Sequence, residues 1–510
     1  MANFDKIKSL DFFSQVIVEA KKSGKKIALC HGTFDLLHIG HVRYFKEARK
    51  YGDILIVTLT ADEFVLKGAD RPIFNESLRA EMIAALEYVD YVSIVKDKTA
   101  IPAIEAIKPD YYVKGSEYKD SLNDITGKII DEEKCLKKYH GQLVFTDDIV
   151  FSSSNLLNNN FATTKNEKIS SIVNQIKEKG GMDYIQQAVE SIKNLKILFI
   201  GETIIDEYCY VSILGKASKE SIICTQYKEN EIFAGGVIAA AKHLSDFCNN
   251  IRVLTTFGDL DSHEHTVKST IHDKIDIDYI KLSERPTIRK QRFVDASYFR
   301  KMYEVYYMDD TPLLPEQENN LRRKLSRHLT WADIVIVNDF GHGCISPKMI
   351  NDICMKANFL ALNVQTNSGN RGFNSFNKYR KANFLCIDEP EIRLAVADKY
   401  SSVEILLQNN LSSLIDCSKA IVTHGKFGSY AFDEQEKVQK IPALTTKVLD
   451  SIGAGDSFLS ISSPFAYLNL PLNEVALFGN IAGAIKVNIV GHRSSVDKVT
   501  FLKYLDTLLK

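Results

Sequence analysis

Two histidines near the N-terminus, His38 and His41, have a spacing that suits phosphate chemistry. They lie three residues apart, so both imidazoles would share one face of a first helical turn and could donate hydrogen bonds to one triphosphate. Residues 31–41 directly follow an apolar, strand-like run, and Gly32 and Gly40 let the backbone approach a ligand closely. The pattern predicts attack on an α-phosphate with pyrophosphate leaving, where positioning and charge stabilisation do most of the work.

The spacing of the two histidines alone leaves other interpretations open. A bare His-x-x-His also occurs in metal-binding pairs and on ordinary protein surfaces. The strand–turn–helix context favours the phosphate site. A helix N-terminus at the carboxyl end of a parallel strand offers accessible N–H groups and the positive end of the helix dipole.

A second phosphate-binding pattern occurs in residues 450–458, DSIGAGDSF, before an apolar helical run. The small residues Gly453, Ala454 and Gly455 would leave N–H groups accessible at a helix start, where charge develops on a transferring γ-phosphoryl group. Asp456 stands beside them and could accept a proton from a substrate hydroxyl, with magnesium bridging the phosphates. A glycine-rich turn capped by Asp is also common in helices without this function.

Both patterns need parallel sheets to position them. Short apolar runs alternate with helical stretches from residue 26 to about residue 157, and the alternation resumes at Leu195. Strands that alternate with helices indicate parallel sheets with right-handed crossovers. The segment between these two alternating regions is polar and rich in lysine, and it is predicted to be helical. We therefore expect a first domain over residues 1–158, a linker over 159–194 and a second domain over 195–510.

Composition and charge narrow the class of protein. The 510 residues include 45% hydrophobic and 25% charged residues, which is typical of globular proteins of several domains. Lys and Arg total 64 against 65 for Asp and Glu, so a globally basic nucleic-acid binder is not expected. The nine scattered cysteines form no C-x-x-C pair, and no run of ~18 apolar residues or export signal is seen, so we expect a cytoplasmic protein without membrane or nucleic-acid partners.

The first pattern resembles the nucleotidyltransferases of the cytidylyltransferase-like superfamily, whose G-x-F-D-x-x-H-x-G-H motif matches residues 32–41 in full. Residues 67–72 (KGADRP) and 113–118 (VKGSEY) are similar to stretches of the heptose-phosphate adenylyltransferase branch, and 152–155 (SSSN) to its nucleotide-binding turn. The resemblance implies that His38 and His41 are catalytic. The implied phosphate- and nucleotide-binding residues are Gly32, Thr33, Phe34, Arg43, Lys114, Ser153 and Ser154. Lys67, Arg71 and Arg79 either face solvent or serve this site, and Asp35 could be a structural cap.

The second half resembles the ribokinase-like sugar kinases over nearly its full length. The resemblance rests on residues 201–206 (GETIID), 234–236 (AGG), 338–343 (NDFGHG), 423–428 (THGKFG) and the D-x-x-G-A-G-D signature at 450–456. The fold implied is a Rossmann-like parallel-sheet transferase domain followed by a ribokinase-like α/β domain with a small lid sheet. Asp456 would be the catalytic base. Nucleotide and phosphate binding is implied for Glu391, Thr423, Gly425, Gly428, Gly453, Ala454 and Gly455, and substrate binding for Asp206, Gly235, Gly236 and Arg292.

Three departures from the kinase pattern bear on its substrate. Ala239 stands where the family usually has an Asn that contacts the sugar. Residues 363–367 (NVQTN) replace the common D-P-K, and Asp388 replaces the Asn of N-x-x-E while Glu391 is kept. These changes put the sugar identity in doubt and leave open a kinase-like module without activity.

The two modules together predict two steps of sugar activation. The chain resembles the bifunctional heptose kinases/heptose-phosphate adenylyltransferases, with the domains in reversed order. The leading expectation is phosphorylation of a sugar or sugar phosphate by ATP with Mg²⁺, then nucleotidyl transfer to give an ADP-sugar such as ADP-heptose. The alternatives are a CTP-dependent transferase making a CDP-sugar or CDP-polyol, and an active transferase attached to a non-catalytic kinase-like module. A homodimer formed through the lid sheet is plausible on the same resemblance.

Overall fold

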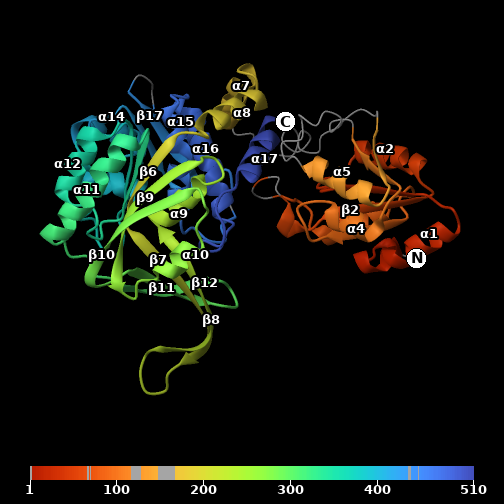
Figure 1. The fold of residues 1–510 in the computed structure, drawn as a ribbon, viewed down its shortest axis with the longest axis horizontal. Helices are drawn as coiled ribbons and strands as arrows, with labels where there is room; N and C mark the ends of the chain where they lie inside the picture. The colour runs from red at the N-terminus through yellow and green to blue at the C-terminus, as the bar shows by residue number, and fades with distance from the viewer. Residues whose placement is uncertain are drawn as a thin grey trace. The chain divides into compact units, whose positions relative to one another are not determined.

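A computed structural model describes most of the chain and divides it into two compact units. Unit 1 comprises Met1–Lys165 and Leu502–Lys510, and unit 2 comprises Asn166–Phe501 (Figure 1). The described residues are 3–65, 68, 71–115, 128–146, 167–434, 438–445 and 447–510. Among the described helices, none is long and apolar enough to cross a bilayer.

Unit 1 contains a five-stranded parallel sheet with the order β3-β2-β1-β4-β5. The strands predicted between residues 26 and 157 all fall in this sheet, and each is a short run that contains β-branched or aromatic residues, which favour strands. Their bounds are β1 (Ile27–Gly32), β2 (Ile54–Thr60), β3 (Tyr91–Val95), β4 (Tyr111–Lys114) and β5 (Gln142–Phe145).

Helices cover both faces of the sheet in unit 1. Alternate residues of β1 point to opposite faces: Ile27 and Leu29 pack against α1, α4 and α5, while Ala28 and Cys30 pack against α2 and α3. This is the pattern of a parallel sheet buried on both faces. The helices are α1 (Phe13–Lys22), α2 (Ile39–Ala48), α3 (Glu76–Ala84), α4 (Ile101–Ile107) and α5 (Lys128–Lys138).

Unit 2 is built on a nine-stranded sheet with the order β10-β9-β6-β13-β14-β15-β16-β17-β18. Strands β10 through β16 are parallel to their neighbours, and β17 and β18 are antiparallel additions at one edge. The bounds are β6 (Lys196–Gly201), β9 (Asn250–Leu260), β10 (Ile275–Pro286), β13 (Ile334–Asp339), β14 (Leu360–Val364), β15 (Phe384–Asp388), β16 (Lys419–Thr423), β17 (Ser429–Asp433) and β18 (Gln439–Ile441).

Two groups of helices sandwich the large sheet. The first group packs on one face in the main apolar core: α11 (Pro315–Trp331), α12 (Pro347–Lys356), α13 (Glu389–Val396) and α14 (Val403–Leu414). The second contacts the sheet or its own members: α9 (Val237–Leu244), α15 (Ala454–Tyr467) and α16 (Leu472–Lys486). The short α10 (Glu264–Ser269) follows β9, and α17 (Lys498–Leu509) ends the chain.

The segment predicted as a polar linker contains two helices in its described part, α7 (Glu167–Glu178) and α8 (Met182–Ile192). Their apolar faces are buried, and α7 contacts α16 while α8 contacts α15. Lys179 and Tyr184 bind the fully buried carboxylate of Glu474 at 2.7 and 2.9 Å. Both helices therefore belong to unit 2.

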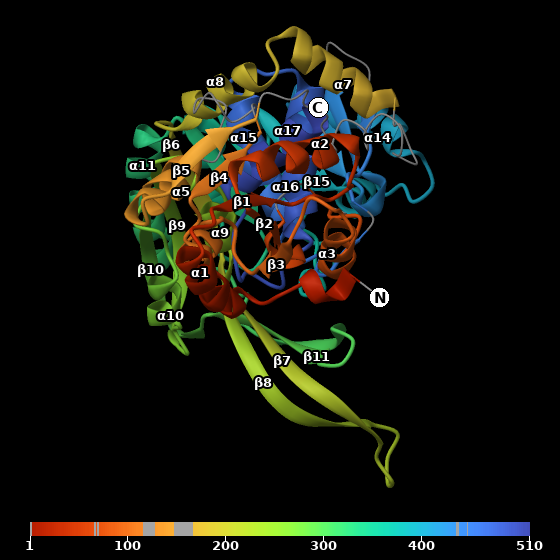
Figure 2. The same cartoon turned by 90° about the vertical axis from the view of Figure 1, so that its right-hand side faces the viewer.

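A four-stranded lid sheet, with the order β12-β11-β7-β8, completes unit 2. Its strands are β7 (Thr203–Lys216), β8 (Ile223–Gly236), β11 (Ile288–Asp295) and β12 (Arg300–Tyr307). The far end of the β7–β8 hairpin projects from the body of unit 2 (Figure 2). The near end carries inward-facing side chains to the carboxyl edge of the large sheet. Together with the parallel sheet of unit 1 and the family matches reported below, this architecture confirms the predicted fold class.

The loop after β1 is fixed by a buried arginine on α3. Arg79 is fully buried and donates to the carbonyl oxygens of Thr33, Thr60 and Phe74 and to the carboxylate of Asp62, at 2.5–3.0 Å. A guanidinium offers five donors in a rigid fork, which suits a site ringed by carbonyl oxygens. The interpretation of Arg79 as a solvent-facing charge is therefore wrong.

A second buried ion pair holds the same loop. Asp35 is fully buried and accepts hydrogen bonds from Arg71 Nη1 at 2.8 Å and from the backbone N–H of Ile73 at 2.6 Å. Asp35 thus supports the loop instead of facing a ligand, and Arg71 serves Asp35. Lys67 lies outside the described residues.

We predict that Arg79→Leu destabilises unit 1 by about 2–4 kcal/mol, because it removes the guanidinium donors of three carbonyl groups, that of Thr60 in a buried bond. Hydrogen exchange of the β1 and β2 amides, measured in the full chain, gives the free energy of opening. Lys46→Leu, on the exposed face of α2, is the control and should change that free energy by less than about 0.5 kcal/mol. Equal protection in the Arg79 variant and the wild type would contradict the assigned role.

Candidate active sites

The first candidate site is the start of α2. His38 is the N-cap residue, and its Nδ1 accepts a hydrogen bond from the backbone N–H of Gly40 at 3.0 Å. His41 Nδ1 accepts from the backbone N–H of His38 at 3.3 Å, and the two rings lie 4.0 Å apart between centroids. Because Nδ1 of each ring is an acceptor, the neutral imidazoles carry their proton on Nε2. Both rings therefore present an N–H donor, as binding of a phosphate oxygen requires.

Phe34 shapes the backbone beside the two histidines. It has a positive φ of 49°, and its ring packs edge-on against His41 at 5.4 Å. A Cβ on Gly32 would lie 3.0 Å from that ring, so a larger residue there would displace it. The predicted residues Gly32, Phe34, His38 and His41 are thus brought together with Thr33, whose carbonyl oxygen Arg79 holds.

Lys114 lies at the carboxyl end of β4 in a buried polar network. Its Nζ is 3.5 Å from the carboxylate of Glu132, which also accepts from the backbone N–H of Ala100 and from the hydroxyl of Tyr112. Burial raises the pKa of Glu132, but Lys114 and the N–H donor outweigh it, and the net shift is downward. Glu132 from α5 therefore holds Lys114 at the strand end, a role that no sequence motif indicated.

His31, at the end of β1, belongs to the same region. Its Nδ1 is 2.9 Å from the hydroxyl oxygen of Thr58 on β2. Burial, reinforced by the charge of Lys114, lowers the pKa of His31 to about 3. His31 is therefore neutral at physiological pH and helps to order the strand ends.

The remaining residues predicted for the transferase site are Arg43, Ser153 and Ser154. Arg43 is exposed on α2, two residues beyond His41, and so projects from a different side of the helix. Ser153 and Ser154 lie outside the described residues, as do Ser116, Glu117 and Tyr118 of the V-K-G stretch.

The second candidate site is the start of α15. Gly453 is its N-cap residue, with φ +77°, and a Cβ there would lie 2.8 Å from the ring of His492. The first N–H groups of a helix have no intrahelical acceptor, so Gly455 and Asp456 present donors at this end. The N–H of Ala454, also predicted to bind phosphate, instead donates to the carbonyl oxygen of Ser451 at 3.3 Å. The Asp456 carboxylate accepts from Asn338 Nδ2 at 3.2 Å. A buried carboxylate and a helix N-terminus that could bind an anion therefore lie within one turn.

The electrostatic surroundings make Asp456 a stronger base than an ordinary aspartate. Burial and, to a lesser degree, the negative charge of Asp206 raise its pKa, while His492 and Lys486 oppose the rise, and the result is about 6. At neutral pH the carboxylate is ionised and is close in pKa to the working pH, which favours proton transfer.

Asp206 organises the lid side of the same site. Its carboxylate is buried and pairs with Arg292 Nη1 on β11 and with His492 Nε2 at 3.2 Å. A Cβ on Gly235 would lie 2.0 Å from Asp206 Oδ2, so glycine is required for the carboxylate to occupy this place. Although burial alone would raise it, Arg292 and His492 hold the pKa of Asp206 well below its usual value.

His492 and Gly236 complete this side of the site. His492 contacts both Asp206 and the N-cap glycine of α15, so it links the lid to the helix start. Sequence reasoning missed it, although its place after the glycine that follows an apolar helix was a signal. Gly236 has φ +59°, and a Cβ there would lie 2.4 Å from the carbonyl oxygen of Glu202. Ala239 is buried in α9, as its apolar side chain requires.

The loop after β13 is held by another buried carboxylate, that of Glu202. Glu202 accepts backbone N–H groups of Phe340, His342 and Cys344 at 3.0–3.4 Å. Burial, together with the nearby Asp339 carboxylate, raises the pKa of Glu202 to about 7. The sequence pattern had given no role to Glu202.

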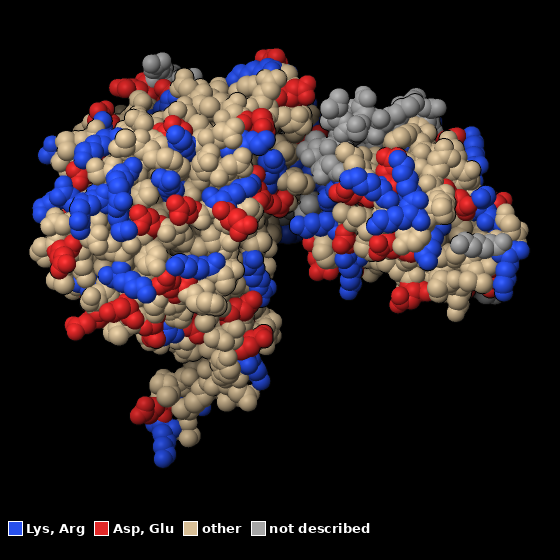
Figure 3. All heavy atoms as spheres, in the orientation of Figure 1, with Lys and Arg blue, Asp and Glu red and all other residues tan. Residues whose placement is uncertain are grey.

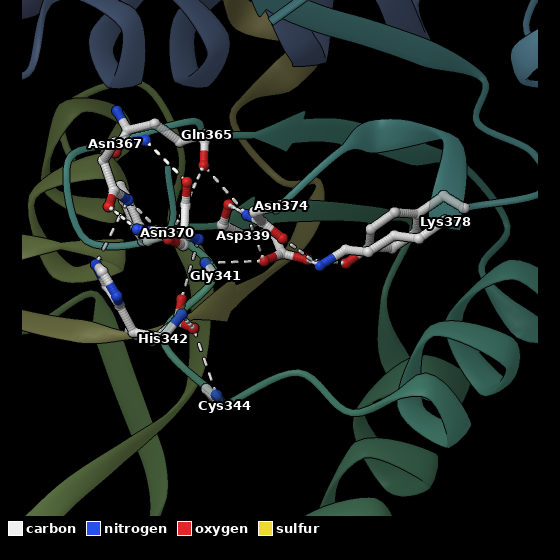
Figure 4. Close-up of polar contacts among 12 residues, drawn as sticks. Asp339, Gly341, His342, Cys344, Gln365, Asn367, Asn370, Asn374 and Lys378 are labelled. Atoms are coloured by element: carbon white, nitrogen blue, oxygen red, sulfur yellow. Dashed lines mark hydrogen bonds and ion pairs between the residues drawn. The ribbon is translucent and has the colours of Figure 1, made fainter. Parts of the chain in front are cut away.

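Asp339 anchors a network of polar side chains beside this loop (Figure 4). It accepts from the Tyr379 hydroxyl at 2.8 Å, from Lys378 Nζ at 2.7 Å and from Asn374 Nδ2 at 3.2 Å. Gly341, at φ +72°, leaves no room for a Cβ beside Asn374. These contacts give Asp339 a structural role.

Amide side chains occupy the loop where the kinase family commonly has D-P-K. Asn367 and Asn370 both donate to the carbonyl oxygen of Phe340, at 2.8 and 3.1 Å, and Asn370 also donates to that of Gln365 at 2.8 Å (Figure 4). These bonds tie the loop after β14 to the loop after β13. The departure from the family pattern is therefore a built hydrogen-bond network.

The predicted nucleotide-side residues occupy the neighbouring strand ends. Asp388 and Glu391 form a reciprocal cap of α13, and Glu391 also accepts from the Thr366 N–H at 3.0 Å. Thr423 pairs in register with Asp388 at the ends of β16 and β15. Gly428, at φ +94°, has a backbone oxygen 2.1 Å from where a Cβ would lie, whereas nothing lies within 4 Å of such a Cβ on Gly425.

Magnesium is the cofactor that the kinase resemblance implies. No cluster of three or more His, Cys, Asp or Glu suited to a metal occurs among the described residues. Mg²⁺ keeps several waters and binds nucleotide phosphates, so one or two carboxylates suffice. Burial raises the pKa of both Asp388 and Glu391, and a cation brought with the nucleotide would favour their charged forms. These residues fit an ion that arrives with ATP.

Comparisons with known proteins agree with this division. The Cytidylyltransferase-like family profile matches residues 29–172, and the profile of the pfkB family carbohydrate kinases matches residues 194–499. The described chain therefore carries a transferase-like domain ahead of a kinase domain, the reverse of the order in the bifunctional relatives.

Curated relatives match over a limited region. The bifunctional protein HldE of Aliarcobacter butzleri is 44% identical over 135 residues, which cover 26% of this chain and 28% of the relative. HldE of Geobacter metallireducens is 46% identical over 129 residues, covering 25% and 26%. The chain thus spans about a quarter of the length of these relatives, and the match falls on the transferase domain.

Solved structures match the kinase part. Ribokinase from Thermotoga maritima is 20% identical, with 61% of this chain and 99% of that chain covered and a TM-score of 0.46. Phosphofructokinase-2 from Escherichia coli is 14% identical, covering 61% and 100%, with a TM-score of 0.49. Since the pfkB profile spans more than half of the residues, the chain belongs to the pfkB family of carbohydrate kinases and joins to that kinase a cytidylyltransferase-like domain.

Proposed function

We propose that the chain activates a sugar in two steps. The kinase domain would transfer the γ-phosphoryl group of ATP to a hydroxyl of a sugar or sugar phosphate. The transferase domain would then couple the sugar phosphate to a nucleotide with release of pyrophosphate. An ADP-sugar, with ADP-heptose as the leading candidate, is supported by the 44–46% identity of the transferase part to two HldE proteins.

The observation that carries the kinase half is the position of Asp456. Its carboxylate would take the proton of the substrate hydroxyl as that oxygen attacks the γ-phosphorus and ADP leaves. The N–H groups at the start of α15 would stabilise the charge that develops on the transferring group. Asp206 and Arg292 would bind sugar hydroxyl groups on the lid side. The buried carboxylate and the helix end beside it support phosphoryl transfer over the alternative of a kinase-like module without activity.

The transferase half depends on the paired imidazoles of His38 and His41. Their Nε2–H groups would donate to the phosphate oxygens of the nucleotide as the sugar phosphate attacks the α-phosphorus. Lys114, held by Glu132, would add positive charge at the end of β4. Magnesium, bound chiefly to the nucleotide phosphates, would neutralise part of their charge in either domain.

A product assay with two point variants tests both halves. The full chain is incubated with a panel of sugars and sugar phosphates, Mg²⁺ and either ATP or CTP, and nucleotide sugar and pyrophosphate are measured by mass spectrometry. Asp456→Asn should slow sugar phosphorylation by about 10²–10⁴-fold and leave nucleotidyl transfer to a supplied sugar phosphate intact. His41→Ala should do the reverse, with a loss of about 10²–10³-fold.

The exposed residues Asp273 and His265 provide the matched controls. Asp273→Asn and His265→Ala should leave both activities unchanged. Turnover with ATP against CTP decides between the ADP-sugar and the CDP-sugar alternatives. Wild-type protein that yields no phosphorylated sugar and no nucleotide sugar from any substrate would refute the proposal.

The pKa of Asp456 predicts the pH dependence of the kinase step. Its value of about 6 means that the base is about nine-tenths ionised at pH 7 and about one-tenth at pH 5. We expect kcat/KM for phosphorylation to fall about tenfold for each pH unit below 6. A profile that stays flat down to pH 4.5 would rule out Asp456 as the base.

A further inference from the structure

Lys486 is a fully buried lysine whose ammonium group is surrounded by backbone carbonyl groups. It is the last residue of α16, and its Nζ donates to the carbonyl oxygens of Ile452 and Gly491, each at 2.7 Å. The carbonyl oxygen of Ile489 lies at 3.4 Å. A buried ammonium group is costly unless its donors are satisfied, so this site is built for a small cation.

A buried carboxylate binds the same two residues from their N–H side. Asp450 accepts the backbone N–H of Ile452 at 3.0 Å and that of Gly491 at 2.7 Å. Asp450 thus accepts the N–H groups of Ile452 and Gly491, and Lys486 donates to the carbonyl oxygens of the same two residues. Two opposite charges therefore connect the turn before α15 to the segment after α16.

Lys486 and Asp450 lie next to the N-terminus of α15, the helix end that the proposed kinase mechanism depends on. A Cβ on Gly453 would lie 3.2 Å from Lys486 Cε, so the N-cap residue rests on the lysine side chain. Ile452 precedes Gly453, and its carbonyl oxygen is one that Lys486 holds. Because a misplacement of about 1 Å can cost about 10²-fold in rate, the position of this turn matters for phosphoryl transfer.

The chemistry of the carbonyl cage is that of a monovalent cation site. Backbone carbonyl oxygens that replace a hydration shell are the ligands by which proteins bind K⁺. We infer that Lys486 is a positioning residue that supplies the anion-binding turn with a tethered monovalent cation, so that this kinase requires no dissolved K⁺ or NH₄⁺. The inference deepens the proposed function and rests on it for its kinetic test only.

The charges around Lys486 support its cationic form. Burial lowers the pKa of Lys486 to about 8, although Asp450, Asp456 and Asp206 oppose this shift and favour the ammonium form; the charge of Lys301 adds to the lowering. The group therefore remains mostly charged at neutral pH, and the geometry of its three carbonyl partners defines its role.

Variants of Lys486 test whether a free ion can take its place. Phosphorylation is measured in choline chloride and in KCl or NH₄Cl at equal ionic strength. Lys486→Ala opens space for an ion, and its kcat should fall about 100-fold in choline chloride and recover at least about tenfold in 0.1 M KCl. Lys486→Met fills the space with an uncharged chain, so it should be slow in every salt. The wild type and the surface control Lys193→Met should differ by less than about twofold between salts.

Thermal unfolding gives a readout that needs no kinase activity. The Tm of Lys486→Ala should rise by about 2–4 °C in 0.1 M KCl relative to choline chloride, because an ion that binds only the folded state stabilises it. The Tm of the wild type should be the same in the two salts. If the wild type phosphorylates no substrate, the proposed function fails, and these Tm values still decide the role of Lys486.

The remaining outcomes also support or overturn the inference that Lys486 acts as a tethered cation. A folded Lys486→Ala protein whose rate and Tm ignore K⁺ would overturn the inference, as would full activity of Lys486→Met in choline chloride. Should Lys486→Ala not fold, the wild type decides. A rate or Tm that depends specifically on K⁺ would overturn the tethered cation, and independence from K⁺ would support it.

Discussion

The start of α15 depends on two buried charges of opposite sign, Asp450 and Lys486. Neither forms a simple ion pair with the other; each instead binds the backbone of Ile452 and Gly491. Backbone groups in a turn must find partners when they are buried, and here one carboxylate and one ammonium supply them. The N–H groups that would stabilise a transferring phosphoryl group follow directly after a turn that these two charges hold in place.

Asp450 also connects this turn to the lid. The hydroxyl of Tyr208 on β7 donates to it at 2.6 Å, and Lys301 of β12 pairs with it. On the other side of the site, His492 links Asp206 of the lid to the N-cap glycine of α15. The lid and the helix start therefore share their polar partners. A sugar bound by lid residues would meet a helix end positioned by the same network.

Local chemistry could be predicted from the sequence, whereas long-range support could not. The i, i+3 spacing of His38 and His41 and the small residues before Asp456 are local patterns, and helix geometry alone says how they lie. Arg79, by contrast, reads as an ordinary surface charge, and only its contact with Thr33, 46 residues away, shows that it is buried structure. Lys486 sits in an apolar helix, and the carbonyl groups that explain it belong to separate turns. Asn367 and Asn370 broke a family pattern, and their bonds to Phe340 appear only once β13 and β14 are adjacent.

The net charge of −1 is consistent with how both sites would bind anions. Acidic and basic side chains are interspersed on the face of the molecule shown in Figure 3. Both candidate sites rely on backbone N–H groups at a helix start, where half a unit of positive charge needs no counterion on the surface. The histidines of the first site add N–H donors without a permanent charge, and Lys486 of the second is neutralised by its carboxylate neighbours. Because the donors are held by buried contacts, their effect on a phosphate is little screened by salt, and a basic surface is not needed.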